Sequence, residues 1–296
     1  MTDYGRPVSF GIFPTPEAAN LSSLWEAVHI ADQEGLDLIG IQDHPYQRRF
    51  VDALTLLTAV ASRTERITVF PDVASLPLRP PAVLAKTAAS IDLLSGGRFE
   101  LGLGAGAFWE AITAMGGPNR TPGQALQALR EAIDVIRLMW SGERAVRYQG
   151  EHYQLAGVKP GPQPAHDIGI WLGVYGPLAL RLLGETADGW IPSIPSMPVA
   201  DLNTRHGIID EAALAAGRDP AVIRRLANVN GVITDHESEG FLRGPTDQWV
   251  DQLTDLVVNH GIDSFLLWPD GDLIDQTARF ALVAEATRSA IGARTE

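Results

Sequence analysis

Short apolar stretches alternate with longer amphipathic stretches along the whole chain. The short stretches are bounded by glycine, proline or polar residues, which is typical of buried β-strands. They predict eight strands, at residues 8–13, 38–42, 67–74, 99–103, 168–172, 189–191, 226–233 and 264–268.

The longer stretches carry apolar residues at helical spacing. In the first of them, Leu24, Val28 and Ala31 share one face. Several begin at a proline, or at an aspartate or threonine that can cap a helix. The predicted helices are residues 21–34, 52–63, 80–94, 121–140, 177–185, 201–216, 245–259 and 272–290.

Eight strand–helix units favour a (β/α)8 barrel over an open doubly wound sheet, which usually has fewer strands per domain. We therefore expect one domain of the α/β class over residues 1–296, with a TIM-barrel fold. Residues 141–167 interrupt the alternation and predict a hairpin and a proline-rich loop, inserted before the fifth strand. In such barrels the active site lies at the carboxyl ends of the strands.

Composition narrows the possible functions. The 296 residues are 45% hydrophobic and 20% charged, as in soluble globular proteins. The chain has no cysteine, which excludes disulfides, cysteine nucleophiles and thiolate metal sites. A net charge of −13 disfavours nucleic acid and anionic lipid, and no apolar run is long enough to cross a membrane. We expect a cytoplasmic protein with small-molecule partners, and no paired histidines mark a metal site.

Residues 94–106 combine a helix end, a strand and a loop with almost no side chains. Ser95, Gly96 and Gly97 end the helix, and 104–106 follow the strand as Gly-Ala-Gly. A flat ring could lie directly on that backbone. The loosened dinucleotide pattern G-x-G-x-x-A also fits at 102–107, but it lies in mid-chain and lacks the acidic residue about 20 positions later that a Rossmann domain needs.

The residues after the other strand ends are mostly aromatic or apolar, with few charges. This composition argues against a glycoside hydrolase, which places two carboxylates across its substrate. Aromatic side chains at strand ends either wall a pocket or pack in the core. The candidates for the wall of a substrate pocket are Phe13, Trp109, Trp190 and Trp268.

Four segments, in the order of the predicted strands, resemble the bacterial luciferase-like monooxygenase superfamily. They are residues 35–44, 76–106, 171–191 and 261–268, with motifs such as IQDH, LLSGGRFELGLGAG, WLGVYGP and ADGWI. The resemblance implies a (β/α)8 barrel that binds FMN or the deazaflavin coenzyme F420 at its mouth, commonly as a homodimer. It also implies a bulge beneath the cofactor ring at the end of the third strand, often with a non-proline cis peptide, formed here by Asp72, Val73 and Ala74.

Departures from the family pattern favour F420 over FMN. Luciferase-type members carry an arginine for the FMN phosphate where this chain has Ala105, whereas the Asp43–His44 pair is more similar to the F420-dependent branch. In the sugar-phosphate dehydrogenase of that branch, a glutamate follows the strand-four glycines. Here Ala107 stands at that position and Glu110 comes three residues later. A sugar phosphate is therefore not the expected substrate.

Three residues are candidates for proton transfer. His44 is the first, because imidazole titrates near neutral pH and can exchange a proton with a substrate. Asp43 would orient that imidazole, and Glu110 would supply a second acid–base group. The alternatives are that His44 only orders its loop and that Asp43 caps a turn.

Two stretches of backbone are candidates for holding the cofactor. The start of the helix at residue 177 offers free amide groups and a dipole that favour a phosphate, although it is also an ordinary helix start. The glycines after the fourth strand either cradle the ring or pack tightly against a neighbouring strand. The cofactor-binding candidates are Asp72, Val73, Ala74, Gly104, Ala105, Gly106, Ala107, Gly173, Val174, Tyr175 and Gly176.

Three functions remain open at this point. The favoured one is hydride transfer between F420 and a small, apolar organic substrate. The second is an FMN-dependent monooxygenase that receives reduced cofactor from a separate reductase. The third is a barrel that binds a cofactor or ligand without turnover.

Overall fold

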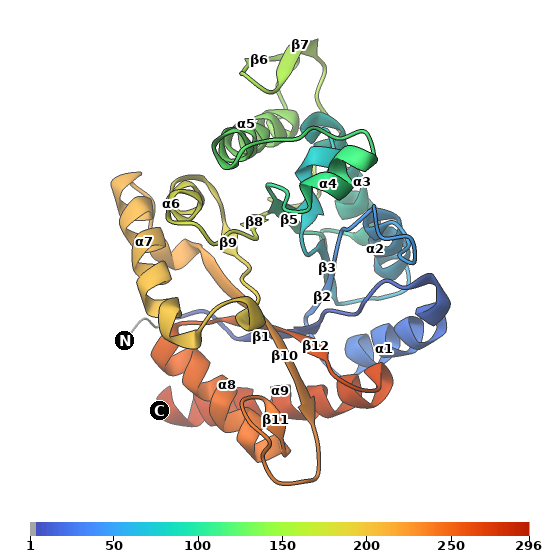
Figure 1. Cartoon of the computed structure of the whole chain (residues 1–296), viewed down its shortest axis with the longest axis vertical. Coiled ribbons are helices and arrows are strands. Elements are labelled where there is room, and N and C mark those ends of the chain that lie inside the picture. The colour runs from blue at the N-terminus through green and yellow to red at the C-terminus, as the bar shows by residue number, and fades with distance from the viewer. Residues whose placement is uncertain (1–3, 296) are drawn as a thin grey trace.

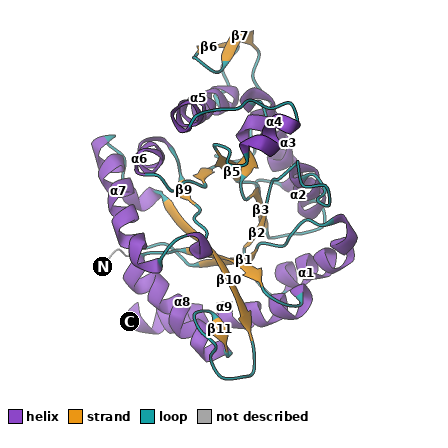
Figure 2. Cartoon of the chain, in the orientation of Figure 1, coloured by secondary structure: helices purple, strands orange, loops and turns teal. Residues whose placement is uncertain are grey.

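The computed structural model describes residues 4–295, and most of its strands form a parallel barrel enclosed by helices. In Figures 1 and 2 the barrel strands lie around the centre and the helices lie outside them. The strands are β1 (Ser9–Ile12), β2 (Leu38–Ile41), β3 (Thr68–Pro71), β4 (Ala74–Ser75), β5 (Leu101–Gly104), β6 (Val146–Gln149), β7 (Gln154–Val158), β8 (Ile170–Leu172), β9 (Gly189–Trp190), β10 (Arg224–Ile233), β11 (Arg243–Gly244) and β12 (Ser264–Pro269).

The barrel strands pair in the order β3-β2-β1-β12-β10-β9-β8-β5-β4, and all of these pairs are parallel. A parallel bridge between Val69 of β3 and Phe99 closes the ring. There the amide of Val69 donates to the carbonyl oxygen of Arg98 at 2.9 Å, and the amide of Glu100 donates to that of Val69 at 3.1 Å. All eight predicted barrel strands occur, so the predicted (β/α)8 fold is confirmed.

The eight predicted helices also occur, with ends shifted by a few residues. One of them, α5, begins with a capping box in which the Thr121 and Gln124 side chains each bind the other's backbone amide. A short additional helix, α4, follows β5. The helices are α1 (Leu21–Gln33), α2 (Ala53–Ala61), α3 (Pro81–Ser95), α4 (Trp109–Ala114), α5 (Pro122–Trp140), α6 (Pro177–Thr186), α7 (Leu202–Ala215), α8 (Thr246–His260) and α9 (Leu273–Thr295).

The third barrel strand departs from its prediction as one continuous strand over residues 67–74. The structure divides it into β3, which pairs with β2, and β4, which pairs with β5. Between them lies a non-proline cis peptide bond that joins Asp72 to Val73, within the three residues for which the family resemblance implies a bulge. The bulge brings Val73 to the carboxyl end of the barrel.

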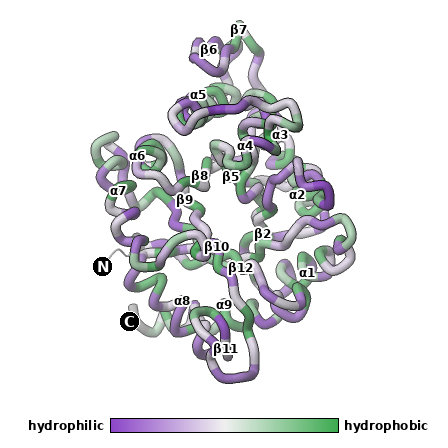
Figure 3. The backbone as a smooth tube through the Cα atoms, viewed as in Figure 1, coloured by the Kyte–Doolittle hydropathy of each residue, from purple (hydrophilic) through white to green (hydrophobic). Residues whose placement is uncertain are grey.

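The predicted insertion contains an antiparallel hairpin of β6 and β7, in which Tyr148 pairs with Leu155. The hairpin stands beyond α5 at the top of Figure 1, and Figure 3 shows β6 as a hydrophilic strand. None of the residues of β6 and β7 lines the cavity described below.

The core has two parts. The larger cluster fills the space between the strands and the surrounding helices. A smaller cluster consists of buried side chains from the barrel strands and from the residues that follow them, and Val73 packs against it. Its members are Phe13, Leu38, Phe70, Trp171, Ile191, Leu226 and Leu266. Over residues 4–295, none of the helices has the length and apolar character needed to cross a membrane.

Candidate active site

A cavity of about 320 Å³ opens at the carboxyl ends of the barrel strands, where such folds place their active sites. Its volume lies within the usual range for small-molecule sites. The ends of β4, β5 and β8 converge on this cavity together with the loop after β2. Most of the residues predicted to bind the cofactor line it. The lining residues are Asp43, His44, Tyr46, Val73, Ala74, Ser75, Gly104, Ala105, Gly106, Ala107, Phe108, Gly173, Val174, Tyr175 and Ala179.

The side chain of Val73 organises one wall of the cavity. A Cβ atom on Gly104 would lie 2.7 Å from Val73 Cγ2, and one on Gly173 would lie 3.1 Å from the same atom. The glycines of β5 and of the loop after β8 are therefore required for close packing against the bulge. At Gly104 this geometry favours the packing alternative, and Gly173 packs in the same way, while both residues also line the cavity.

Three aromatic rings meet at the edge of the cavity. Nδ1 of His44 lies 2.6 Å from the hydroxyl oxygen of Tyr46, and the ring of Phe108 contacts both, with centroid distances of 5.5 and 5.9 Å. Burial lowers the pKa of His44, and the negative charge of Asp43 only partly opposes this effect. The imidazole is therefore neutral at pH 7 and is oriented by Tyr46.

Asp43 has a different partner from the one predicted. Its carboxylate accepts from Nε and Nη2 of Arg79 at 2.6 and 2.7 Å and from the amide of Ser75 at 2.9 Å, rather than from the imidazole of His44. The role of Asp43 in orienting His44 is therefore corrected: Asp43 ties the loop after β2 to the segment after β4. Arg79 also contacts Asp52, the N-cap residue of α2.

The loop after β8 leads directly into α6. Gly176 is the N-cap residue of this helix and has no side-chain cap, so the first amides of α6 are free of such a partner. Nη1 of Arg205, on α7, donates to the carbonyl oxygen of Tyr175 at 2.5 Å. A cationic side chain and a helix N-terminus therefore lie together beside the cavity, which is an arrangement that attracts anions.

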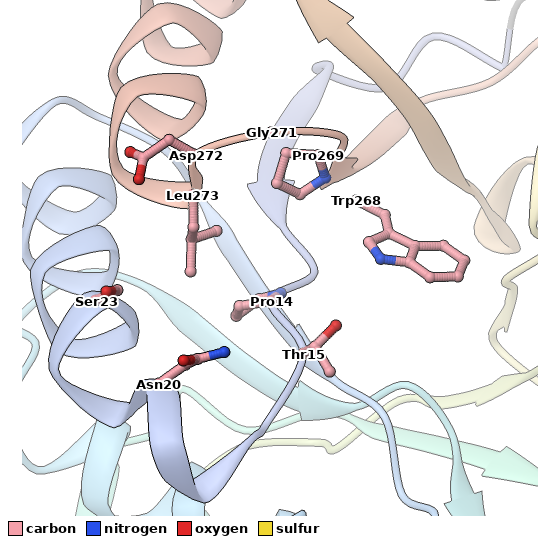
Figure 4. Close-up of a pocket in the computed structure, with 9 residues that line it drawn as sticks. All are labelled: Pro14, Thr15, Asn20, Ser23, Trp268, Pro269, Gly271, Asp272 and Leu273. Atoms are coloured by element: carbon pink, nitrogen blue, oxygen red, sulfur yellow. The ribbon is translucent and has the colours of Figure 1, made fainter.

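The predicted aromatic wall is distributed differently. Trp190 is fully buried and donates from Nε1 to the carbonyl oxygen of Val174 at 2.8 Å, so it supports the cavity from the core and does not line it. Phe13 is buried, and its ring packs edge-on against Trp268. Trp268 lines a second pocket of about 320 Å³ between the ends of β1 and β12 and the starts of α1 and α9, where Figure 4 shows it near Thr15 and Pro14.

Three further candidates lie near the cavity without lining it. Glu110 is exposed on α4, and Trp109 beside it packs over Gly106. Asp72 is 8% exposed and occupies the first position of the bulge. The structure thus places neither Glu110 nor Asp72 among the residues that border the cavity.

Tyr46, Phe108, Arg79 and Arg205 were missed in the sequence. Tyr46 and Phe108 were within reach of sequence reasoning, because each follows a predicted strand end by a few residues. Arg79 lies within the 76–106 segment that resembles the family, but no local pattern marks it as a partner of Asp43, and Arg205 lies outside the four segments. Their contacts depend on which loops the barrel brings together.

Comparison with known proteins places this fold in a family. A model of the luciferase-like monooxygenase family matches residues 7–241. F420-dependent glucose-6-phosphate dehydrogenases are similar over much of the chain. The one from Microbacterium testaceum is 29% identical over 72% of this chain and 64% of its own length, and the one from Rhodococcus erythropolis is 31% identical over 76% and 68%.

Solved structures show the same fold. An F420-dependent secondary alcohol dehydrogenase, in complex with an F420–acetone adduct, has a TM-score of 0.85 at 17% identity, over 95% of this chain and 99% of the other. The coenzyme F420-dependent tetrahydromethanopterin reductase from Methanopyrus kandleri has a TM-score of 0.80 at 20% identity, over 93% and 98%. The chain spans only 64% of the length of the Microbacterium relative. Because the family model covers most of the chain, this protein belongs to the luciferase-like monooxygenase family.

Proposed function

We propose that this chain is an oxidoreductase that uses coenzyme F420 to move a hydride to or from a small, mainly apolar organic substrate. The observation that carries the proposal is the convergence of the Val73 bulge, the 104–107 loop and the 173–175 loop on one cavity with His44 at its edge. The relatives named above as F420-dependent support the choice of cofactor. When bound, F420 supplies hydride exchange at carbon, and the protein binds, orients and excludes water.

The cofactor-binding residues divide into two groups. The bulge and the bare backbone of the two glycine loops provide a flat surface for the ring. The free amides at the start of α6, with Arg205 nearby, suit the phosphate-bearing tail. Tight packing of Gly104 and Gly173 against Val73 fixes this surface before any ligand binds.

His44 moves the proton in this proposal. A neutral imidazole takes the hydroxyl proton of an alcohol as a hydride leaves the carbon that bears the hydroxyl group, and it returns the proton when a carbonyl is reduced. The lowered pKa of His44 keeps the ring neutral and ready to accept. In this proposal Nδ1–H of His44 donates to the hydroxyl oxygen of Tyr46, so the unprotonated Nε2 accepts the proton of the substrate.

The lining of the cavity supports an uncharged substrate. Most of its side chains are apolar, and within the described part of the chain no lysine or arginine lines it. A sugar phosphate carries two negative charges that need cationic partners. Ala107 also replaces the glutamate that the sugar-phosphate dehydrogenases carry after the strand-four glycines. We therefore propose a substrate class different from that of the relatives named as glucose-6-phosphate dehydrogenases.

Anaerobic turnover tests the proposal. Reduced F420 is mixed with the protein and a panel of ketones and enones in the absence of oxygen, and its absorbance spectrum should change to that of oxidised F420. The variant His44→Ala should abolish this turnover while F420 still binds. Oxygen-dependent oxidation of reduced FMN, coupled to product formation, would instead establish the FMN-dependent monooxygenase. Binding of either cofactor with no turnover across the panel would favour the non-catalytic barrel.

A further inference from the structure

A large apolar side chain at the edge of the cavity is open to solvent. Phe108 lines the cavity and is 58% exposed. A single exposed apolar ring is ordinary on a protein surface, but a ring that borders a cavity offers contact area to a ligand. Tyr175, at 37% exposed, also lines the cavity, but it leads into α6, where the cofactor tail is proposed to bind. Phe108 is therefore the exposed ring that is free to meet a substrate.

The ring of Phe108 lies against the two side chains that serve the proposed proton transfer. Its centroid is 5.5 Å from that of His44, and the two ring planes are nearly perpendicular at 79°. The ring of Tyr46 lies 5.9 Å from it, at 57°. These are ordinary contact distances for aromatic pairs. Because Phe108 and His44 touch and line the same cavity, a substrate held at Nε2 of His44 has the exposed ring beside it.

The backbone around Phe108 is held in place by packing. Gly106 has a φ of +100°, and a Cβ on it would lie 2.6 Å from Cγ of Pro77 and 3.0 Å from Cη2 of Trp109. Phe108 is the N-cap residue of α4, and its carbonyl oxygen accepts from the amide of Ile112 at 2.9 Å. Ile112 is fully buried and anchors α4 in the core. The exposed ring is thus a fixed wall and does not belong to a loose loop.

The residues before Phe108 leave room beside its ring. Ala105, Gly106 and Ala107 all line the cavity, and they carry a methyl group or only a hydrogen atom. A ligand group in this part of the cavity therefore meets methyl groups and an aromatic ring. Removal of apolar surface from water is favourable, and aromatic rings gain further from contact with one another. The lining favours a flat apolar group.

We propose that Phe108 determines specificity by contacting a flat apolar substituent on the reacting carbon of the substrate, while the oxygen on that carbon bonds to His44. The preferred substrates are then ketones and secondary alcohols that carry an aromatic or cyclic group, and short aliphatic compounds are poor substrates. This inference deepens the proposed function and rests on it for the identity of the bound molecule as a substrate. The contact itself requires neither F420 nor turnover.

Ligand binding to the full chain without cofactor tests the contact directly. Acetophenone and acetone are the matched probes, because both are methyl ketones and differ only in a phenyl or a methyl group. The chain is labelled with 13C at histidine, and the His44 resonance, assigned by its loss in His44→Gln, shifts as a ketone binds. Phe108→Ala should raise the Kd of acetophenone about tenfold, or about 1.4 kcal/mol, and that of acetone less than about twofold.

Met115→Ala is the matched control and should bind both ketones as the wild type does. Met115 is 51% exposed at the carboxyl end of α4 and does not line the cavity. Phe108→Leu, which keeps apolar bulk without a flat ring, should show a smaller loss than Phe108→Ala and serves if the alanine variant does not fold. An unchanged Kd for acetophenone in both variants, an equal loss for the two ketones, or no saturable binding to the wild type would overturn the proposal.

Titration with F420 separates this contact from cofactor binding. Phe108→Ala should bind F420 as tightly as the wild type does. A loss of F420 affinity as large as the loss for acetophenone would assign the ring to the cofactor and overturn the inference. Because the ketone measurement contains no F420, its failure leaves the proposed function standing. Absence of F420 binding to the wild type would remove the proposed function and leave the ketone contact standing.

Discussion

The hydroxyl oxygen of Tyr46 lies 2.6 Å from Nδ1 of His44, two residues earlier in the same loop. Burial, together with the negative charge of Asp43, raises the pKa of Tyr46 to about 12, so the phenol stays protonated at neutral pH. Burial also lowers the pKa of His44. The neutral imidazole is thus oriented through one nitrogen, and the other nitrogen is available to a substrate.

Replacing Tyr46 should therefore slow turnover without weakening substrate binding. Tyr46→Phe removes the hydroxyl that orients His44, and loss of one hydrogen bond, worth about 1 kcal/mol, is expected to lower kcat roughly tenfold with little change in KM. Steady-state kinetics measure both values. Tyr148→Phe is the matched control, because Tyr148 lies on the distant hairpin and binds Asp134. Equal kcat values for Tyr46→Phe and the control would remove Tyr46 from the site.

Arg79→Met should strongly destabilise the fold. Asp43 is almost completely buried and accepts two hydrogen bonds from Arg79, so the substitution leaves a buried carboxylate without its cation. Breaking a buried ion pair in this way costs about 3–5 kcal/mol. Urea denaturation measures the loss. Arg49→Met, which removes an exposed ion pair with Glu17, should cost under about 1 kcal/mol. Similar losses in both variants would contradict the structural role of Arg79.

Gly104→Ala should distort the wall of the cavity. The added methyl group would lie 2.7 Å from Val73 Cγ2, and overpacking of this kind costs about 1–3 kcal/mol. Thermal denaturation and F420 titration should both report the defect, and Val73→Ala in the same chain should relieve it. Gly123→Ala, in the first turn of α5, is the control, because nothing lies within 4 Å of the added atom. A double variant no better than Gly104→Ala alone would show that Val73 is not the obstacle.

Stability should depend on pH through His166, at the amino-terminal ends of the barrel strands. The carboxylate of Glu100, 3.6 Å from Nε2, is the first cause that raises the pKa of His166 to about 9, and Asp92 contributes at 2.7 Å from Nδ1. Because the folded pKa exceeds the ordinary value of 6.5, the stabilisation is complete below about pH 6.5 and is lost as the pH rises through 9.

The free energy of unfolding of the wild type and of His166→Gln, measured in urea at several pH values, checks this prediction. The wild type should be the more stable at low pH, and its advantage should shrink above pH 9. A difference that stays constant across this range would show that His166 does not gain a proton on folding.

The sequence was sufficient for the barrel and for the location of the cavity, because strand ends follow from local patterns and parallel strands place their carboxyl ends at one face. It was insufficient for side-chain partners. Asp43 binds Arg79, which lies 36 residues further along the chain, and only the closed barrel brings them together. Trp190 and Trp268 both lie at strand ends, yet one is in the core and the other lines a separate pocket. Homodimer formation stays a prediction.

The most direct test of the central claim is an equilibrium titration of the purified protein with F420 and with FMN at the same salt concentration. F420 should bind at one site per chain and more tightly than FMN, and Gly104→Ala should weaken it, because the cavity surface depends on close packing against Val73. Tighter binding of FMN would contradict the cofactor assignment. Binding of neither, by protein shown to be folded, would contradict the proposed role of the cavity.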